Sequence, residues 1–149
     1  HKHSASLLRY TGFADALMEM NIPINSEWIE EGNFSFDSGF NAGLKILESS
    51  LCPSVIFASN DYMAAGVMKA AQMKGIQIPS ELSLIGFDDS PIAEQLWPSL
   101  STIRQPVEEM AYHAAKLLLG TLDGLSEKTE SKEFKSELIL RESLIRLSD

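Results

Sequence analysis

The sequence contains a single cysteine, Cys52, among 149 residues. One cysteine excludes an intramolecular disulfide framework and any metal site built from several cysteines. Its place between Leu51 and Pro53, just before an apolar run, predicts a small buried or half-buried thiol. No apolar stretch in the sequence approaches the roughly 20 residues that a membrane-spanning helix needs, so we expect no contact with a membrane.

Basic residues are also scarce. The sequence has 12 Lys and Arg against 21 Asp and Glu, which gives a formal net charge of −9 at pH 7. A surface that binds nucleic acid needs Lys and Arg to displace counterions from the phosphates. We therefore expect this segment not to bind DNA directly. Its content of 44% hydrophobic and 22% charged residues is otherwise that of an ordinary globular domain.

Sequence motifs of common active sites are missing. There is no glycine-rich phosphate loop, no Gly-x-Ser-x-Gly elbow and no His-Glu-x-x-His helix. His113 falls inside a predicted helix, without an evident acid or cysteine partner in a loop. Asp88 and Asp89 would suit acid–base chemistry as a pair, but neighbours on an extended segment point to opposite faces, so we do not expect them to share a site. We predict that the chain is not an enzyme and uses no metal ion or cofactor.

Helix and strand patterns alternate along the chain. Apolar residues at helical spacing predict helices over residues 4–20, 36–48, 61–74 and 107–122. Continuous apolar runs predict strands buried on both faces at residues 54–58 and 82–87. Further extended segments are predicted at residues 27–31, 100–104 and 137–147. This alternation predicts an α/β fold with a parallel, doubly wound sheet and right-handed crossovers.

Polar side chains follow both predicted buried strands. Ser59, Asn60 and Asp61 come directly after the first strand, and residues 88–90 follow the second. Ligands of open α/β sheets bind beyond the carboxyl ends of the strands, so these residues are candidates for a binding site. A purely structural role is also open, because Asn60 suits the cap of the next helix and Asp61 its first turn. Residues 88–91 could likewise form only a turn.

Four ordered stretches carry a family resemblance and cover nearly the whole chain. They are SVIFASNDYMAAGV at residues 54–67, IPSELSLIGFDDS at 78–90, PSLSTIRQP at 98–106 and ELILRES at 137–143. Together they resemble the lactose-repressor/galactose-repressor (LacI/GalR) family of transcription regulators. Four matches in the same order are far more specific than any single motif.

The resemblance implies a periplasmic-binding-protein-like fold, in which two Rossmann-like subdomains, each a parallel sheet flanked by helices, hold a small effector between them. Residues 1–104 would form the second effector-binding subdomain. Residues 105–133 would form a crossover and a helix that belongs to the first subdomain, and residues 134–149 the returning C-terminal strand. The rest of the first subdomain and a DNA-binding headpiece would precede this segment.

The resemblance also assigns effector contacts to Arg9, Phe34, Asn60 and Asp88, with His3 as a further polar contact. The planar fork of an arginine suits bidentate contact, and an aromatic face offers apolar area to the C–H side of a sugar ring. Asparagine both donates and accepts, and a carboxylate accepts paired hydroxyl groups. On the residues alone, Arg9 could equally be a solvated helix residue and Phe34 a core aromatic.

By this resemblance the chain is the effector-binding and dimerisation domain of a cytoplasmic transcription regulator. It would bind a small molecule, a sugar, and couple that binding to operator DNA through the headpiece. We expect a homodimer formed through the helix at residues 61–74 and the apolar residues Ile92, Leu96 and Trp97. The alternative is a periplasmic sugar-binding protein of a transport system, which has the same fold.

Overall fold

The structure is a computed structural model that describes residues 4–122 and 132–145. Its elements are α1 (Ser4–Glu19), the 3-10 helix η1 (Ser26–Trp28), α2 (Phe36–Ile46), β1 (Val55–Phe57), α3 (Asp61–Lys74), β2 (Ser83–Ile85), α4 (Ile92–Gln95), β3 (Thr102–Arg104), α5 (Val107–Leu122) and β4 (Glu137–Ile139). The predicted alternation of helices and strands is confirmed, and α3 and α5 have the predicted bounds. None of the described helices is long and apolar enough to cross a membrane.

The predictions for residues 27–31 and for Cys52 are wrong. The segment predicted as a strand at residues 27–31 begins instead with η1, which Asn25 caps by accepting a hydrogen bond from the Glu27 N–H at 3.0 Å. The Trp28 indole then donates to the carbonyl of Leu51 at 2.6 Å. The capped turn satisfies backbone groups locally, so this stretch needs no strand partner. Cys52 is exposed, not buried.

The sheet begins with β1 and β2, which pair in parallel from Val55–Ser83 to Phe57–Ile85. It continues to the segment that contains β3, because the amides of Gly86 and Asp88 donate to the carbonyls at residues 101 and 103, each at 2.9 Å. β3 in turn pairs antiparallel with β4. Within the described residues β1 pairs with β2 alone, so it is an edge strand. Val55 is 50% exposed, so β1 is not buried on both faces as predicted.

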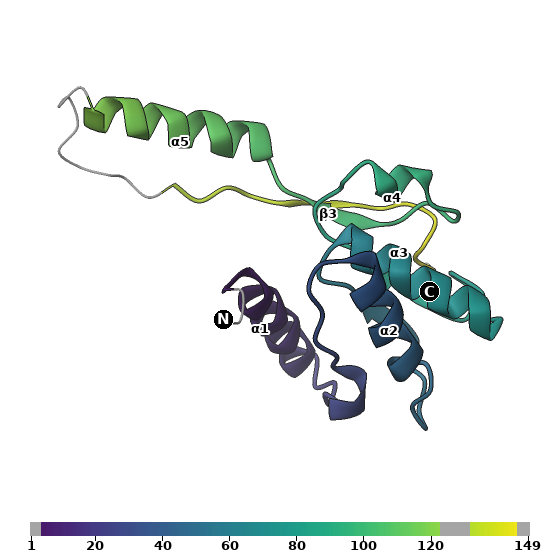
Figure 1. The fold of residues 1–149 in the computed structure, drawn as a ribbon. Coiled ribbons are helices and arrows are strands. Elements are labelled where there is room, and N and C mark those ends of the chain that lie inside the picture. The colour runs from purple at the N-terminus through teal and green to yellow at the C-terminus, as the bar shows by residue number, and fades with distance from the viewer. Residues whose placement is uncertain (1–3, 123–131, 146–149) are drawn as a thin grey trace.

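Helices α2 and α3 lie side by side at a distance that only glycine allows (Figure 1). A Cβ atom on Gly39 would lie 2.2 Å from the carbonyl oxygen of Met63, and one on Gly66 would lie 2.2 Å from that of Phe36. The core forms between these helices and the sheet. Its buried apolar members include Ile46, Leu47, Ile56, Ala64, Val67, Ala70, Leu82, Leu84 and Leu100.

Helix α5 projects away from the other helices and from the sheet, at the end of the paired strands β3 and β4 (Figure 1). Tyr112, Leu118 and Leu119 on this helix are each at least 60% exposed. An amphipathic helix normally buries its apolar face against another element. In the described part of the chain these side chains of α5 stay uncovered, and the proposed division of the chain into subdomains stays a prediction.

Candidate functional site

Arg9 links α1 to the carboxyl ends of β1 and β2. Its Nη1 donates to the carbonyl oxygen of Ser59 at 2.5 Å, and its Nη2 donates to Asp88 Oδ1 at 3.1 Å. Its Cζ lies 3.9 Å from the centre of the Phe87 ring, a distance typical of a cation–π contact. The side chain is only 16% exposed, so Arg9 is not a solvated helix residue.

A row of aromatic rings fixes α1, and therefore Arg9, against the sheet. Phe13 of α1 stacks on Phe57 of β1 with ring centres 5.8 Å apart. Phe57 meets Phe87 edge-on at 6.4 Å. Phe87 also contacts the Arg9 guanidinium, so the same row of rings that packs against α1 positions the Arg9 side chain over the sheet.

Asp88 lies in the loop that follows β2, with a backbone φ of 103°. Residues other than glycine rarely adopt positive φ, and the Asp88 N–H is held by the carbonyl of Ile103 at 2.9 Å. Asp88 Oδ1 accepts hydrogen bonds from Arg9 and from Gln105 Nε2, each at 3.1 Å. Within the described residues, the hydrogen bonds of this carboxylate use Oδ1, so Oδ2 can accept a hydrogen bond from a ligand.

Burial raises the pKa of Asp88 above its ordinary value. The positive charge of Arg9 opposes this increase, and the negative charge of Asp61 adds to it. The hydrogen bonds from Gln105 and Arg9 lower the pKa but do not cancel the effect of burial. Further donors would favour the ionised carboxylate, and hydroxyl groups of a ligand are such donors.

Asn60 caps α3 and also holds Phe34. Its Oδ1 accepts from the Met63 N–H at 2.9 Å, and its Nδ2 donates to the carbonyl of Phe34 at 3.0 Å. Phe34 has a φ of 66°, and its ring centre lies 5.8 Å from Arg9 Cζ. The capping role that the sequence left open is therefore present. Asn60 is 8% exposed and has a second lone pair and a second N–H beyond these two hydrogen bonds.

The structure thus brings Arg9, Phe34, Asn60 and Asp88 together beyond the carboxyl ends of β1 and β2, and their contact with an effector stays a prediction. His3 lies outside the described residues. Of these four residues only Asp88 lines an open hollow of about 490 Å³, whose lining is formed by residues 88–89 and 104–109. Pockets of this size suit small ligands. In the described ranges, no group of three or more His, Cys, Asp or Glu is placed to hold a metal ion.

Sequence reasoning missed Phe87 and Gln105, which contact Arg9 and Asp88 respectively. Both lie inside stretches that carry the family resemblance, so the resemblance offered a signal for them. Phe87 reads as the last apolar residue of a buried strand, and Gln105 reads as the residue before a proline. Neither pattern by itself indicates that the side chain contacts Arg9 or Asp88.

A sequence profile of the periplasmic binding protein-like domain matches residues 1–144. The chain is 35% identical over 144 residues to the probable HTH-type transcriptional repressor ExuR of Bacillus subtilis (strain 168), covering 97% of this chain and 43% of that relative. The crystal structure of the Escherichia coli transcriptional repressor ascG has 38% identity and a TM-score of 0.87, with 97% of this chain and 52% of that chain covered.

A third relative is a sugar-binding transcriptional regulator of the LacI family from Escherichia coli, solved in complex with phosphate. It has 37% identity and a TM-score of 0.89, with 97% of this chain and 51% of that chain covered. The chain therefore spans about half the length of the relatives that it matches. These matches confirm the predicted resemblance: the chain belongs to the periplasmic binding protein-like domain family, and its homologues are transcriptional repressors of the LacI family.

Proposed function

We propose that this chain is the effector-binding part of a LacI-type transcription regulator, and that its effector is a neutral, hydroxyl-rich small molecule, a sugar. The observation that carries the proposal is the Arg9–Asp88 pair, held at 3.1 Å over the Phe87 ring. Neither group is saturated by this contact. A guanidinium has five N–H donors, and Asp88 Oδ2 can still accept.

A pair of neighbouring hydroxyl groups matches this arrangement. One hydroxyl would donate to Asp88 and accept from a remaining N–H of Arg9, and the Phe34 ring would cover the C–H face of the sugar. A neutral ligand fits better than an anion, because Glu108 and Glu109 line the hollow beside Asp88, and Arg104, which also lines it, is paired with Asp89. The sugar-binding regulator among the relatives supports the same class of ligand.

In the intact protein, effector binding would favour one arrangement of the two subdomains and thereby change the operator affinity of a DNA-binding headpiece. Repressors among the relatives favour this function over sugar transport in the periplasm, and they favour a cytoplasmic, non-enzymatic protein. With a net charge of −9, this segment alone should show no sequence-specific DNA binding in a mobility-shift assay. The residues encoded before His1 distinguish the two functions, since a basic helix-turn-helix indicates a regulator and a signal peptide a transport receptor.

We also propose that the regulator is a homodimer joined through α3 and the segment around α4. Trp97, the last residue of the predicted interface segment at residues 91–97, is 85% exposed, and Tyr62 and Met73 of α3 are 49% and 62% exposed. Large exposed aromatic and apolar side chains of this kind are what an interface covers. Light scattering at tens of micromolar, roughly the range where a modest interface is populated, should find a dimer for the wild type and a monomer for Trp97→Asp.

Calorimetry of the intact regulator against a panel of neutral sugars tests the binding site. Asp88→Asn keeps the shape but turns one acceptor oxygen into a donor, and should weaken binding by roughly 1.5–3 kcal/mol, the range for hydrogen bonds to charged groups. Arg9→Ala should weaken binding as well, and Arg9→Lys should restore it only in part, because lysine lacks the planar fork.

The matched control is Asp37→Asn, which makes the same chemical change at an exposed position on α2. It should bind the sugar as the wild type does. A sugar that binds the wild type, Asp88→Asn and Arg9→Ala equally well would show that the site has been assigned to the wrong residues.

A further inference from the structure

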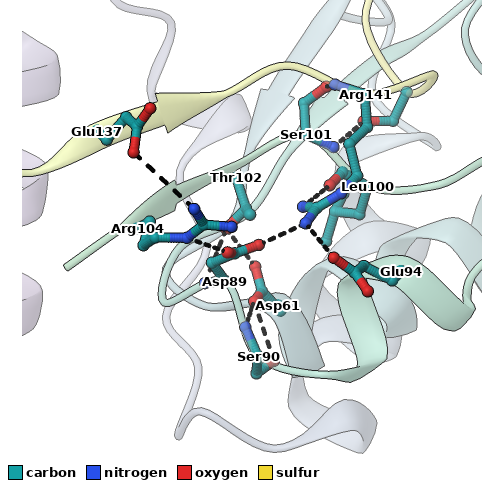
Figure 2. A network of polar contacts seen from close by, with 11 residues as sticks. Asp61, Asp89, Ser90, Glu94, Leu100, Ser101, Thr102, Arg104, Glu137 and Arg141 are labelled. Carbon is teal, nitrogen blue, oxygen red and sulfur yellow. Dashed lines mark hydrogen bonds and ion pairs between the residues drawn. The ribbon is translucent and has the colours of Figure 1, made fainter. Parts of the chain in front are cut away.

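The residue next to Asp88 belongs to a second polar network, which Figure 2 shows from close by. Asp89 Oδ2 accepts a hydrogen bond from Arg104 Nε at 2.5 Å. Asp89 Oδ1 forms an ion pair with Arg141 Nη2 at 2.8 Å. The Asp89 side chain is 7% exposed. Arg104 ends β3, and Arg141 follows β4, so one buried carboxylate is shared by arginines from the two strands that connect to α5.

Arg141 is itself held in place by further contacts. Arg141 Nη1 donates to the carbonyl of Leu100 at 2.9 Å, and its Nη2 lies 3.0 Å from Glu94 of α4. Burial by itself would raise the pKa of Asp89, but the contacts with Arg141 and Arg104 outweigh it and hold the pKa below its ordinary value. The carboxylate is therefore in its charged form at neutral pH.

The loop formed by residues 88–90 is strained and anchored from several sides. Asp88 and Asp89 have φ values of 103° and 50°. Two consecutive residues of this kind persist only when the surrounding structure dictates their conformation. The N–H of Asp89 donates to Thr102 Oγ1 at 3.3 Å, and the N–H of Ser90 donates to Asp61 Oδ2 at 2.6 Å. With the Asp88 N–H bound to Ile103, three successive amides of the loop have fixed partners.

We infer that Asp89 is a positioning residue for the effector site: it sets the place of the Asp88 carboxylate by tying the loop at residues 88–90 to both β3 and β4. This inference rests on the proposed function, because it assumes that Asp88 contacts the effector. Displacement of either strand would move Arg104 or Arg141, and with it Asp89, the residue next to Asp88. An effector bound at Asp88 favours the arrangement in which both arginines reach Asp89.

Amide hydrogen exchange of the intact regulator without ligand tests the tie itself. In Asp89→Asn, we expect the peptide that covers residues 87–91 to exchange about tenfold faster, since the lost contacts allow local opening. The matched control is Glu94→Gln, which removes the other carboxylate that contacts Arg141. The Glu94 side chain is 72% exposed. It should leave exchange in this peptide within about twofold of the wild type. Unchanged exchange in Asp89→Asn overturns the inference.

Calorimetry with the sugar that binds the wild type tests the link to the effector site. In the wild-type protein, Asp89→Asn should weaken sugar binding about tenfold. In a protein that already carries Asp88→Asn, adding Asp89→Asn should weaken binding by less than about twofold further, because Asp89 acts through Asp88. A merely structural role predicts instead that the two losses add, which would overturn the inference. If no sugar binds the wild type, the proposed function fails, and the exchange measurement still decides whether Asp89 holds the loop.

Discussion

Asp61 is the first residue of α3, and its side chain is fully buried. Its carboxylate accepts hydrogen bonds from Thr102 Oγ1 at 2.6 Å, from the Ser90 N–H at 2.6 Å and from the Ser90 hydroxyl at 2.9 Å (Figure 2). Asp61 therefore joins α3 to the loop after β2 and to β3. We predict that Asp61→Ala lowers the free energy of unfolding by about 4–5 kcal/mol.

The magnitude follows from the donors that lose their acceptor. Each buried donor left without a partner costs about 1–3 kcal/mol. The Ser90 N–H cannot turn towards another acceptor and Thr102 is fully buried, so two donors at about 2 kcal/mol each give roughly 4 kcal/mol. The negative charge at the start of a helix adds about 0.3–1 kcal/mol. Asp61→Asn keeps one acceptor oxygen and should cost about half as much.

Urea unfolding followed by circular dichroism measures these differences. The control is Asp37→Ala, which removes an exposed carboxylate from the first turn of α2. This variant should lose only the helix-dipole contribution of about 0.3–1 kcal/mol. If Asp61→Ala costs no more than Asp37→Ala, the buried hydrogen bonds of Asp61 do not stabilise the fold, and the reasoning is refuted.

Three further predictions concern packing and pH. Gly66→Ala should lower the free energy of unfolding by more than about 3 kcal/mol, because the new Cβ collides with the α2 backbone. A Cβ on Gly12 would have nothing within 4 Å, so Gly12→Ala should raise the free energy of unfolding by up to about 1 kcal/mol. Thermal unfolding compares the two variants. The lowered pKa of Asp89 means that its charged form adds stability above the ordinary value of 3.8, and this stability is lost as pH falls through the lower folded-state pKa. Urea unfolding over a pH series should therefore show a smaller acid-side loss for Asp89→Asn. The pKa of Asp88 is raised above 3.8, so calorimetry should find sugar affinity declining as pH falls through that higher pKa, and Asp88→Asn should lack this dependence.

The sequence predicts those parts of the fold that depend on local patterns. Apolar spacing gives α3 its observed bounds, and the left-handed Gly75, with a φ of 73°, ends that helix as expected. The polar residues after β1 and β2 were expected near each other, because parallel strands end at the same edge of a sheet. The assignment of Arg9 to the candidate site depended on the family resemblance, because its position on a helix does not indicate that the guanidinium reaches Asp88.

The remaining features depend on contacts between distant residues, which local patterns do not contain. Ser143 donates its hydroxyl hydrogen to the carbonyl of Leu84 and accepts a hydrogen bond from the Ser101 N–H, so it joins three segments from inside the core. Within the sequence it reads as a polar residue near the end of a predicted strand. The same holds for Arg104 and Arg141, whose convergence on Asp89 follows from the pairing of β3 with β4.

Asp88 and Asp89 show how adjacent carboxylates take different roles. The sequence predicts that they do not share a site, because neighbours on an extended segment point to opposite faces. In the structure both residues have positive φ values. Their side chains are separated instead by the positions of their partners. Asp88 meets Arg9 and Gln105, while Asp89 meets Arg104, the residue before Gln105. The last residue of β3 and the residue after it therefore contact two successive residues of the loop. A ligand bound at Asp88 would lie one residue away from the Asp89–Arg104 ion pair, so we expect effector binding to be coupled to the position of the chain that follows β3.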